Sequence, residues 1–344
     1  MNGYTRASAL GPISDFVETR GGSIERIFNR VDLPLALLNN PDLPLPLREQ
    51  FKVLSEAGRE IGDPFFGAAL GRHVRMEKLS AFGAWVSSAP TLASAIDRSH
   101  RGLNRYLQTA TVLQFQTSET RARWSIGFLD PGGDGRFQNE LLGVSYLIDG
   151  VRSYAGRSWS PTIIRSTCVG TAQAAALEKV FEAPVLQGAS VSAIEFDIAL
   201  LSATARRQAS PTFGLEPPIP PTTGYREDIA ALLAIALLEG YPKIDWIASK
   251  LKTSRRTLQR SLDAEGCNFS VMLEGLLKDR ATALLDSTDR DLTDIALLLG
   301  YSDSAHFSRA FRRWTGMAPS RYRRARRDLS VRNPSEQILT AFSK

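Results

Sequence analysis

The sequence predicts a multidomain α+β fold, in which a mixed α/β N-terminal domain is followed by an all-α C-terminal domain with two helix-turn-helix units. Three observations predict it. Helix-like and strand-like spacings of apolar residues alternate over the first 208 residues, a proline-rich run follows, and every later segment has helical spacing with short breaks. A chain of 344 residues with 43% hydrophobic content can bury about two cores.

The N-terminal domain, expected at residues 1–208, contains both kinds of apolar spacing. Residues 47–61 and 92–107 have the period of amphipathic helices, whereas residues 112–116 and 123–128 alternate like half-buried strands. This part of the chain is therefore mixed α and β.

A linker is expected at residues 209–224, where five prolines prevent a helix or a central strand from continuing. The C-terminal domain then covers residues 225–328, and residues 329–344 form a tail. The longest apolar run, residues 229–238, is read as a buried helix, because a membrane span needs roughly 18 apolar residues. With neither a membrane span nor a secretory signal, a cytoplasmic location is expected.

Cysteine and histidine are too sparse for a structural metal site. Cys168 and Cys267 form no CxxC pair, and only His73, His100 and His306 could supply imidazole ligands. We expect no metal, no disulfide and no cofactor.

Basic residues concentrate in the C-terminal domain. Residues 225–328 carry 18 basic and 14 acidic side chains, while residues 1–224 carry 22 and 21. One acid-free basic cluster lies at residues 250–260, and eight arginines lie at residues 309–327. Basic runs are often only solvated helix faces, so the spacing of the residues has to decide whether they contact a polyanion.

An internal repeat supplies that spacing. At a spacing of 48 residues, the sequence matches Ile247, Ala248 and Leu251 to Ile295, Ala296 and Leu299. At a spacing of 49 residues, it matches Leu258, Arg260 and Leu262 to Phe307, Arg309 and Phe311. Finally, Gly266 matches Gly316. Each copy has the pattern of a helix, a tight turn and a second helix. One such hairpin could be accidental, whereas two matched copies favour a pair of helix-turn-helix units that bind DNA.

In the first copy, Ser254 is the expected N-cap of the second helix, and Leu258 and Leu262 form its buried face. Another face carries side chains that can pair with base edges in the major groove; they are Arg256, Gln259 and Arg260. Lys252 and Arg255 are expected to contact phosphates, and Ser254 is also counted among the candidate DNA-binding residues.

In the second copy, Phe307, Phe311 and Trp314 form the buried stripe. The candidate DNA-binding residues lie on or near the exposed side of this helix; they are Ser304, Ala305, His306, Ser308, Arg309, Arg312 and Arg313.

The segment from residue 242 to 324 closely resembles the DNA-binding domain of AraC/XylS-type transcriptional regulators. The run DIALLLGYSDSAHFSRAFRRWTGMAPSRYR matches the family signature at Gly300, Phe307, Phe311, Gly316, Pro319 and Tyr322. Residues 269–286 resemble the helix that connects the two units, with Arg280 and Ala283 at the family positions. Lys252 departs from the pattern because the first turn usually has glycine there, which predicts strain, and Gly275 interrupts the connecting helix.

Residues 10–202 resemble the effector domain named the arabinose-binding type in a branch of these regulators. The segments that carry this resemblance include SAFGAWVSSAPTLASAIDRSHRGLNRY and FQNELLGVSYLIDGVRSYAG. The resemblance implies a regulator of transcription that responds to a small-molecule effector. Activation is favoured over repression, but the sequence leaves both open. The resemblance does not identify the effector, and arabinose does not follow from the name. The implied partners are double-stranded promoter or operator DNA, RNA polymerase, the effector and a second copy of the chain.

Two alternatives remain open. A DNA-processing enzyme such as a recombinase would need an acidic metal cluster, which the sequence does not show, and no GxSxG, P-loop, HExxH or dinucleotide motif is present. The glycines at 130–135 are read as a hairpin turn and Cys168 as a small buried residue. We therefore expect no enzyme.

In the other alternative, the N-terminal domain only dimerises. Aromatic residues that could line an effector pocket are more often core packing; they are Phe82, Trp85, Tyr106, Phe128, Tyr146 and Tyr154. Arginines that could anchor a carboxylate could equally be surface charges; they are Arg72, Arg75, Arg101 and Arg105.

Overall fold

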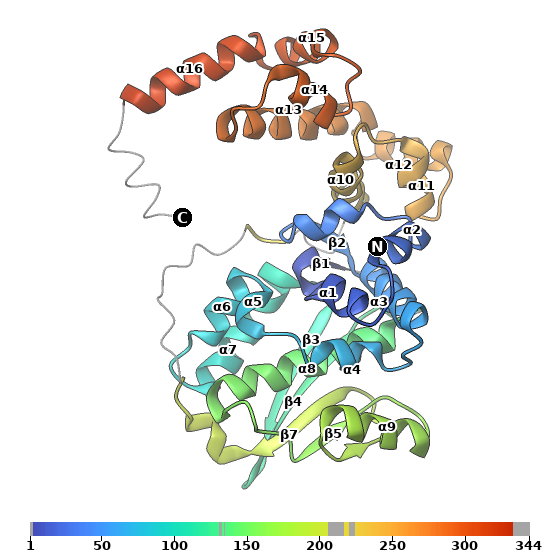
Figure 1. Cartoon of the computed structure of the whole chain (residues 1–344), viewed down its shortest axis with the longest axis vertical. Coiled ribbons are helices and arrows are strands. Elements are labelled where there is room, and N and C mark those ends of the chain that lie inside the picture. The colour runs from blue at the N-terminus through green and yellow to red at the C-terminus, as the bar shows by residue number, and fades with distance from the viewer. Residues whose placement is uncertain (1–2, 131–132, 134, 206–216, 220–223, 333–344) are drawn as a thin grey trace. The chain divides into compact units, whose positions relative to one another are not determined.

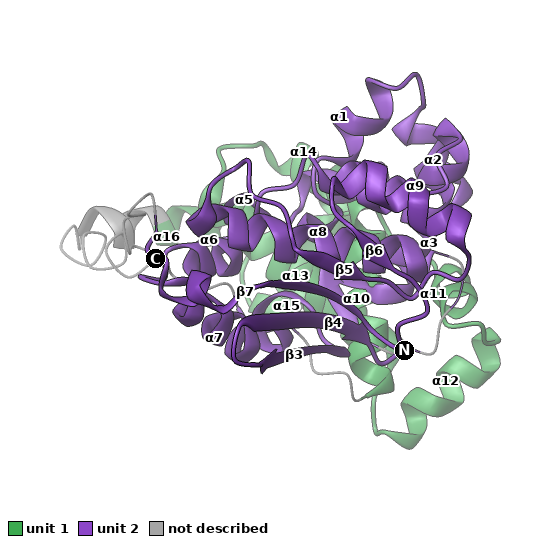
Figure 2. Cartoon of the chain, turned by 90° about the horizontal axis from the view of Figure 1, so that it is seen from below, with its two compact units in different colours: residues 1, 223–344 green, residues 2–222 purple. Residues whose placement is uncertain are grey.

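The structure is a computed structural model that describes residues 3–130, 133, 135–205, 217–219 and 224–332, with side chains up to residue 326. The chain forms two compact units (Figure 2). The N-terminal unit covers residues 2–222, and the C-terminal unit covers residues 223–344 together with Met1.

The expected linker at residues 209–224 lies largely outside the described residues. Its described part includes Ile219, which is buried and donates its backbone N–H to the carbonyl oxygen of Arg105 at 2.8 Å. This end of the proline-rich run therefore packs on the N-terminal unit.

The N-terminal unit contains a five-stranded sheet in the order β3-β4-β7-β5-β6, in which β5 and β6 pair in parallel and the other neighbours are antiparallel. Its strands are β3 (Thr111–Thr117), β4 (Arg121–Phe128), β5 (Ile163–Arg165), β6 (Val185–Leu186) and β7 (Ser192–Asp197). A separate pair joins β1 (Tyr4–Arg6) to β2 (Pro44–Pro46). The strands expected at 112–116 and 123–128 are confirmed as the β3–β4 pair.

Helices make up most of the rest of this unit (Figure 1). They are α1 (Ile13–Glu18), α2 (Ile24–Arg30), α3 (Leu47–Ile61), α4 (Phe66–Gly71), α5 (Met76–Leu79), α6 (Ala81–Ser87), α7 (Leu92–Gly102), α8 (Arg136–Ala155) and α9 (Thr171–Phe181). Short helical turns lie at Ala7–Leu10, Leu35–Asn39, Leu103–Leu107 and Ile198–Ser202. The helix expected at 47–61 is confirmed, and the one expected at 92–107 is α7 followed by a π-helical turn.

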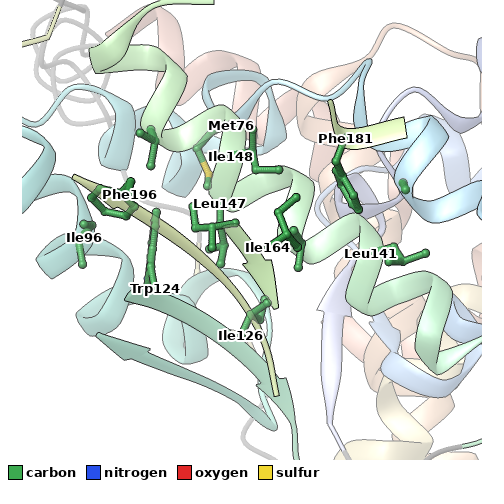
Figure 3. Packing of buried hydrophobic residues seen from close by; sticks show 14 of the residues in the cluster. Met76, Ile96, Trp124, Ile126, Leu141, Leu147, Ile148, Ile164, Phe181 and Phe196 are labelled. Atoms are coloured by element: carbon green, nitrogen blue, oxygen red, sulfur yellow. The ribbon is translucent and has the colours of Figure 1, made fainter. Parts of the chain in front are cut away.

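The long helix α8 packs against the sheet and builds the main core. Trp124 and Ile126 of β4 face Leu147 and Ile148 of α8, with Met76 beside them (Figure 3). Small residues allow this close packing, since a Cβ on Gly143 would lie 3.1 Å from the Ile126 side chain. This core surrounds a cavity between the sheet and the helices.

Two expectations about loop residues have different outcomes. The hairpin turn expected at 130–135 is wrong: this segment, described only in part, joins β4 to α8, whereas the β3–β4 turn lies at residues 118–120. The reason is that a glycine-rich run ends a strand equally well before a helix. Cys168 is 3% exposed, as expected of a small buried residue.

The C-terminal unit is all helical within its described residues. Its helices are α10 (Tyr225–Ala236), α11 (Ile244–Lys250), α12 (Arg255–Ala264), α13 (Phe269–Ser287), α14 (Leu292–Leu298), α15 (Ser304–Thr315) and α16 (Pro319–Arg332), with a 3₁₀ turn at Leu237–Glu239. Residues 229–238 are confirmed as a buried helix. None of the helices in the described part of the chain combines the length and apolar composition that a membrane span needs.

One hydrophobic core holds this unit together. It joins Ile247 and Leu258 of the first repeat to Ile295 and Phe307 of the second through the buried face of α13. Both repeats therefore belong to one packed domain with α13 between them.

Candidate nucleic-acid interface

The two repeats form the same turn, hydrogen bond for hydrogen bond. The backbone N–H of Thr253 donates to the carbonyl oxygen of Ala248 at 2.9 Å, and that of Tyr301 donates to Ala296 at the same distance. One residue earlier, the N–H of Lys252 bonds to Ser249 at 3.0 Å and that of Gly300 to Leu297 at 2.9 Å. The repeat seen in the sequence is therefore a repeat of two helix-turn-helix units.

The turn requires a left-handed backbone at its central residue. Gly300 adopts φ +79°, and Lys252 adopts φ +52° at the equivalent position. A residue with a Cβ is strained in this region, as expected from the departure at Lys252. Gly300 has a second constraint, because a Cβ there would lie 2.1 Å from the backbone nitrogen of Tyr241.

The first candidate reading helix, α12, is oriented by its cap and its buried face. The Ser254 hydroxyl accepts the backbone N–H of Thr257 at 3.2 Å, which confirms Ser254 as N-cap. Leu258 and Leu262 are buried. Because residues are 100° apart on a helix, Arg260 lies about 160° around α12 from both leucines, and Arg256 lies about 160° from Leu258 and about 120° from Leu262, so both arginines face away from the core.

Arg255 lies on the flank of α12 instead. With Gln259 and Asp263 it lines a groove of about 560 Å³ beside the start of α13 and the loop at Tyr241. Lys252, Ser254, Arg255, Arg256, Gln259 and Arg260 are all exposed.

The second candidate reading helix, α15, begins differently from the first. Its N-cap is Asp303, which accepts the backbone N–H of His306 at 2.7 Å. This hydrogen bond lowers the pKa of Asp303. The His306 ring lies 3.1 Å from both the Ser302 hydroxyl and the Asp303 carboxylate, so the imidazole is oriented at the edge of the helix.

The outward face of α15 is centred on Ala305, Arg309 and Arg312, opposite the buried Phe307 and Phe311. Ser304 and Ser308 are half-exposed at its edges. Arg313 is exposed too, but it donates to Glu274 of α13 at 2.5 Å.

The connecting helix α13 lies between the two helix-turn-helix units of the C-terminal domain (Figure 1). Arg280, at its family position, donates to the carbonyl oxygen of Leu237 at 2.7 Å, and burial lowers the pKa of its guanidinium. Arg326 of α16 pairs with Asp286 at 3.2 Å. Gly275 is exposed, and α13 continues through it without a break.

The sequence did not single out the residues that hold this arrangement. Glu274, Asp286 and Asp303 were missed, because an acidic residue near basic clusters gives no signal of its partner in a single sequence. The acidic residue just before α15 was the usable clue for Asp303, since aspartate is a strong N-cap.

The N-terminal unit holds the pocket-lining candidates. Phe82, Phe128 and Tyr146 line a small, mainly apolar cavity. Trp85 lies under the Arg98 guanidinium instead, and the Tyr154 hydroxyl donates to the Ala89 carbonyl oxygen at 2.9 Å.

Three of the candidate arginines have local contacts. Arg72 pairs with Glu182 at 2.7 Å, Arg101 pairs with Asp97, and Arg105 lies over the ring of Tyr106. Arg75 lies beside the cavity wall, as described below.

Comparison with known families decides the identity of the chain. The family described as "Arabinose-binding domain of AraC transcription regulator, N-term" matches residues 21–205, more than half of the chain. The chain belongs to the AraC family of transcriptional regulators. A family described as "Helix-turn-helix domain" matches residues 247–325. The resemblance stated from the sequence is confirmed for both domains, and the chain is an AraC-family DNA-binding transcriptional regulator.

Individual relatives are similar to this chain over different lengths. The ornithine utilization regulator of Pseudomonas aeruginosa is 42% identical over 93 residues, which is 27% of either chain. The HTH-type transcriptional regulator VirS of Mycobacterium tuberculosis is 26% identical over 334 residues, or 94% of this chain and 97% of VirS. The crystal structure of the transcriptional regulator CdpR from P. aeruginosa covers 88% of this chain and 98% of its own, at 24% identity and a TM-score of 0.36.

Proposed function

We propose that this AraC-family regulator binds a specific promoter site by inserting α12 and α15 into two successive segments of the major groove. The equivalence of the two turns carries the proposal, because each turn presents a capped helix whose outward face is basic or polar. The 19-residue α13 between them is about 28 Å long, which is most of the roughly 34–36 Å that one turn of DNA spans. Both helices can therefore contact one face of a non-palindromic site.

Within α12 we assign base reading to Arg256, Gln259 and Arg260 and phosphate contacts to Lys252 and Arg255. Arginine can bond both acceptors of a guanine edge, and glutamine can pair in two places with adenine. The outward orientation of Arg256 supports the first assignment, and the position of Lys252 in the turn supports the second.

Within α15 we assign base reading to the outward face, which includes Ala305, Arg309 and Arg312. Ser304, His306 and Ser308 lie at its edges, where short polar side chains reach the sugar-phosphate backbone. Arg313 would have to leave Glu274 to bind DNA, and phosphate is a suitable competitor for that ion pair.

The remaining parts of the proposal concern regulation. The arabinose-binding-type domain would bind a small-molecule effector, form a homodimer and change transcription by RNA polymerase in the cytoplasm. Activation rather than repression rests on the family resemblance alone. Catalysis is not proposed, and no group of three or more potential metal ligands lies close together in the described ranges.

A footprint of the full chain on DNA from its own promoter region tests the proposal. Two protected segments about 10 bp apart are expected for each protomer. Protection of a single short segment would contradict the two-helix arrangement. Incubation of labelled DNA with Mg²⁺ tests the recombinase alternative, since cleavage or joining would favour that enzyme.

A further inference from the structure

A small cavity of about 60 Å³ lies between the sheet and the helices of the N-terminal unit. Its wall is mainly apolar, with contributions from Met76, Phe82, Trp124 and Leu147 (Figure 3 shows three of these). Among the described residues, no charged side chain lines it. Whatever enters this cavity must therefore be uncharged there.

Two polar atoms in the cavity wall have no hydrogen-bond partner in the described part of the chain. They are the indole Nε1 of Trp124, which is 1% exposed, and the amide Oε1 of Gln50, which is 2% exposed. The other end of the Gln50 amide donates to Asn139 at 2.6 Å. A buried donor and a buried acceptor without partners are unfavourable, and a hydroxyl group can act as the partner of either one.

A second, larger hollow of about 480 Å³ lies next to the first. Its wall includes His73, Arg75 and Lys78, and the described residues that line it include no acidic side chain. The Asp149 carboxylate lies 3.8 Å from the Arg75 guanidinium, but Asp149 is not part of the wall of this hollow. The Ser8 hydroxyl, a further buried atom without a described partner, also lies in this wall. This hollow suits an anionic group.

Leu79 and Tyr146 line both spaces and form the partition between them. The Tyr146 hydroxyl lies on the side of the outer hollow, 3.3 Å from where a Cβ on Gly11 would be. Burial raises the pKa of Tyr146, so its hydroxyl stays neutral in the partition. If these two side chains move aside, the joined volume falls within the range of about 300–1,000 Å³ typical of ligand pockets.

We infer that the N-terminal unit binds a small carboxylate with an apolar body and a hydroxyl group at the far end from the carboxylate. The body passes between Leu79 and Tyr146, the hydroxyl accepts from Trp124 Nε1 and donates to Gln50 Oε1, and the carboxylate stays beside Arg75 and Lys78. This inference rests on the proposed function, because it names the effector class of the proposed effector domain.

The test is calorimetric titration of the full chain with three compounds of matched shape. 4-Hydroxyphenylacetate has all three features, phenylacetate lacks the hydroxyl, and 4-hydroxyphenylethanol lacks the charge. The first compound is expected to bind at least 10-fold more tightly than either of the others. Equal affinities, or tighter binding of a control compound, would overturn the assignment.

Two variants locate the groups. Trp124→Phe keeps an aromatic ring but removes the donor, so the preference for 4-hydroxyphenylacetate over phenylacetate should fall, because only Gln50 Oε1 then pairs with the hydroxyl; an unchanged preference would overturn the assignment. Lys78→Gln should weaken both acids about 10-fold and leave 4-hydroxyphenylethanol unchanged, while Lys179→Gln, an exposed lysine of α9, is the matched control. Ala9→Leu, which fills the inner cavity, should abolish binding of all three compounds; unchanged binding would place the ligand elsewhere.

The outcome is separable from the proposed DNA function. Each variant is first checked for an unchanged thermal unfolding transition and for binding to promoter DNA without ligand. If the wild-type chain binds DNA but none of the three compounds, the effector assignment is refuted and the DNA-binding proposal stands. If the wild-type chain binds the compounds as expected but does not bind DNA, the DNA-binding proposal is refuted and the effector assignment stands.

Discussion

Lys252 allows the cost of its backbone conformation to be separated from the value of its charge. Its φ of +52° places it in the left-handed region, where a residue with a Cβ costs about 1–2 kcal/mol. Glycine removes that strain but gains entropy in the unfolded chain, which offsets about 0.4–1 kcal/mol. We expect Lys252→Gly to raise the free energy of unfolding of the C-terminal unit by about 0.5–1 kcal/mol. The Tm should then rise by about 2–8 °C for a domain of this size.

Lys252→Ala is the matched control, because it removes the same ammonium group and keeps the strained Cβ. Both variants should bind DNA more weakly, to a similar extent on specific and random sequences, and reduce the salt slope by about 1 if Lys252 contacts one phosphate. Only the glycine variant should unfold at a higher temperature in a calorimetric scan. Equal Tm values would refute the strain argument, and unchanged DNA affinity would refute the phosphate contact.

Four further outcomes are expected. A fragment of residues 224–332 should bind DNA alone, with log K against log[salt] sloping at about −0.9 per phosphate contact; a flat line in a salt titration would exclude this electrostatic binding. Arg256→Ala should cost about 1–3 kcal/mol on the specific site and relax preference at one base in a binding selection, whereas equal losses on random DNA would make Arg255 and Gln259 the readers. Arg280→Ala should lower stability in urea by about 1–3 kcal/mol, since it leaves the buried Leu237 carbonyl with only the long 3.5 Å hydrogen bond from the Gly240 N–H, and an unchanged midpoint would contradict this. The hydrogen bonds that Asp303 accepts lower its pKa below the ordinary value of 3.8, so the stability that its carboxylate contributes is complete above pH 3.8 and is lost as the pH falls through the lowered pKa. Asp303→Asn should remove this pH dependence from the Tm.

The two DNA-binding units could be predicted in detail because their information is local. Helix period, turn residues and the N-cap Ser254 all lie within about twenty consecutive positions, and the second copy repeats the pattern of the first, although its own N-cap, Asp303, was missed. Strands 112–116 and 123–128 were found for the same reason, since alternation is visible within one strand. The strand order β3-β4-β7-β5-β6 was not predictable, because it depends on pairings between residues about seventy positions apart.

The residues that line the cavity in the N-terminal unit could not be predicted from the sequence, because they too come together only in the folded chain. Gln50, Trp124 and Asn139 come from α3, β4 and α8, and no spacing in the sequence relates them. An aromatic residue also carries no mark that separates cavity lining from core, so Phe82 and Trp85 looked alike although only Phe82 reaches the cavity. Side-chain direction in three dimensions decides such cases.

The difference between the two turns is itself informative about DNA binding. In the second helix-turn-helix unit the central residue has to be glycine, since any Cβ would overlap the backbone at Tyr241, and that position therefore cannot carry a charge. In the first unit the same backbone conformation is occupied by a lysine, which costs stability that glycine would not. A strained residue that no packing contact explains points to a gain elsewhere, and an ammonium group at the turn can supply it by contacting a phosphate. On this argument the first turn contributes more to general DNA affinity than the second, and the second unit depends on α15 itself for its contacts.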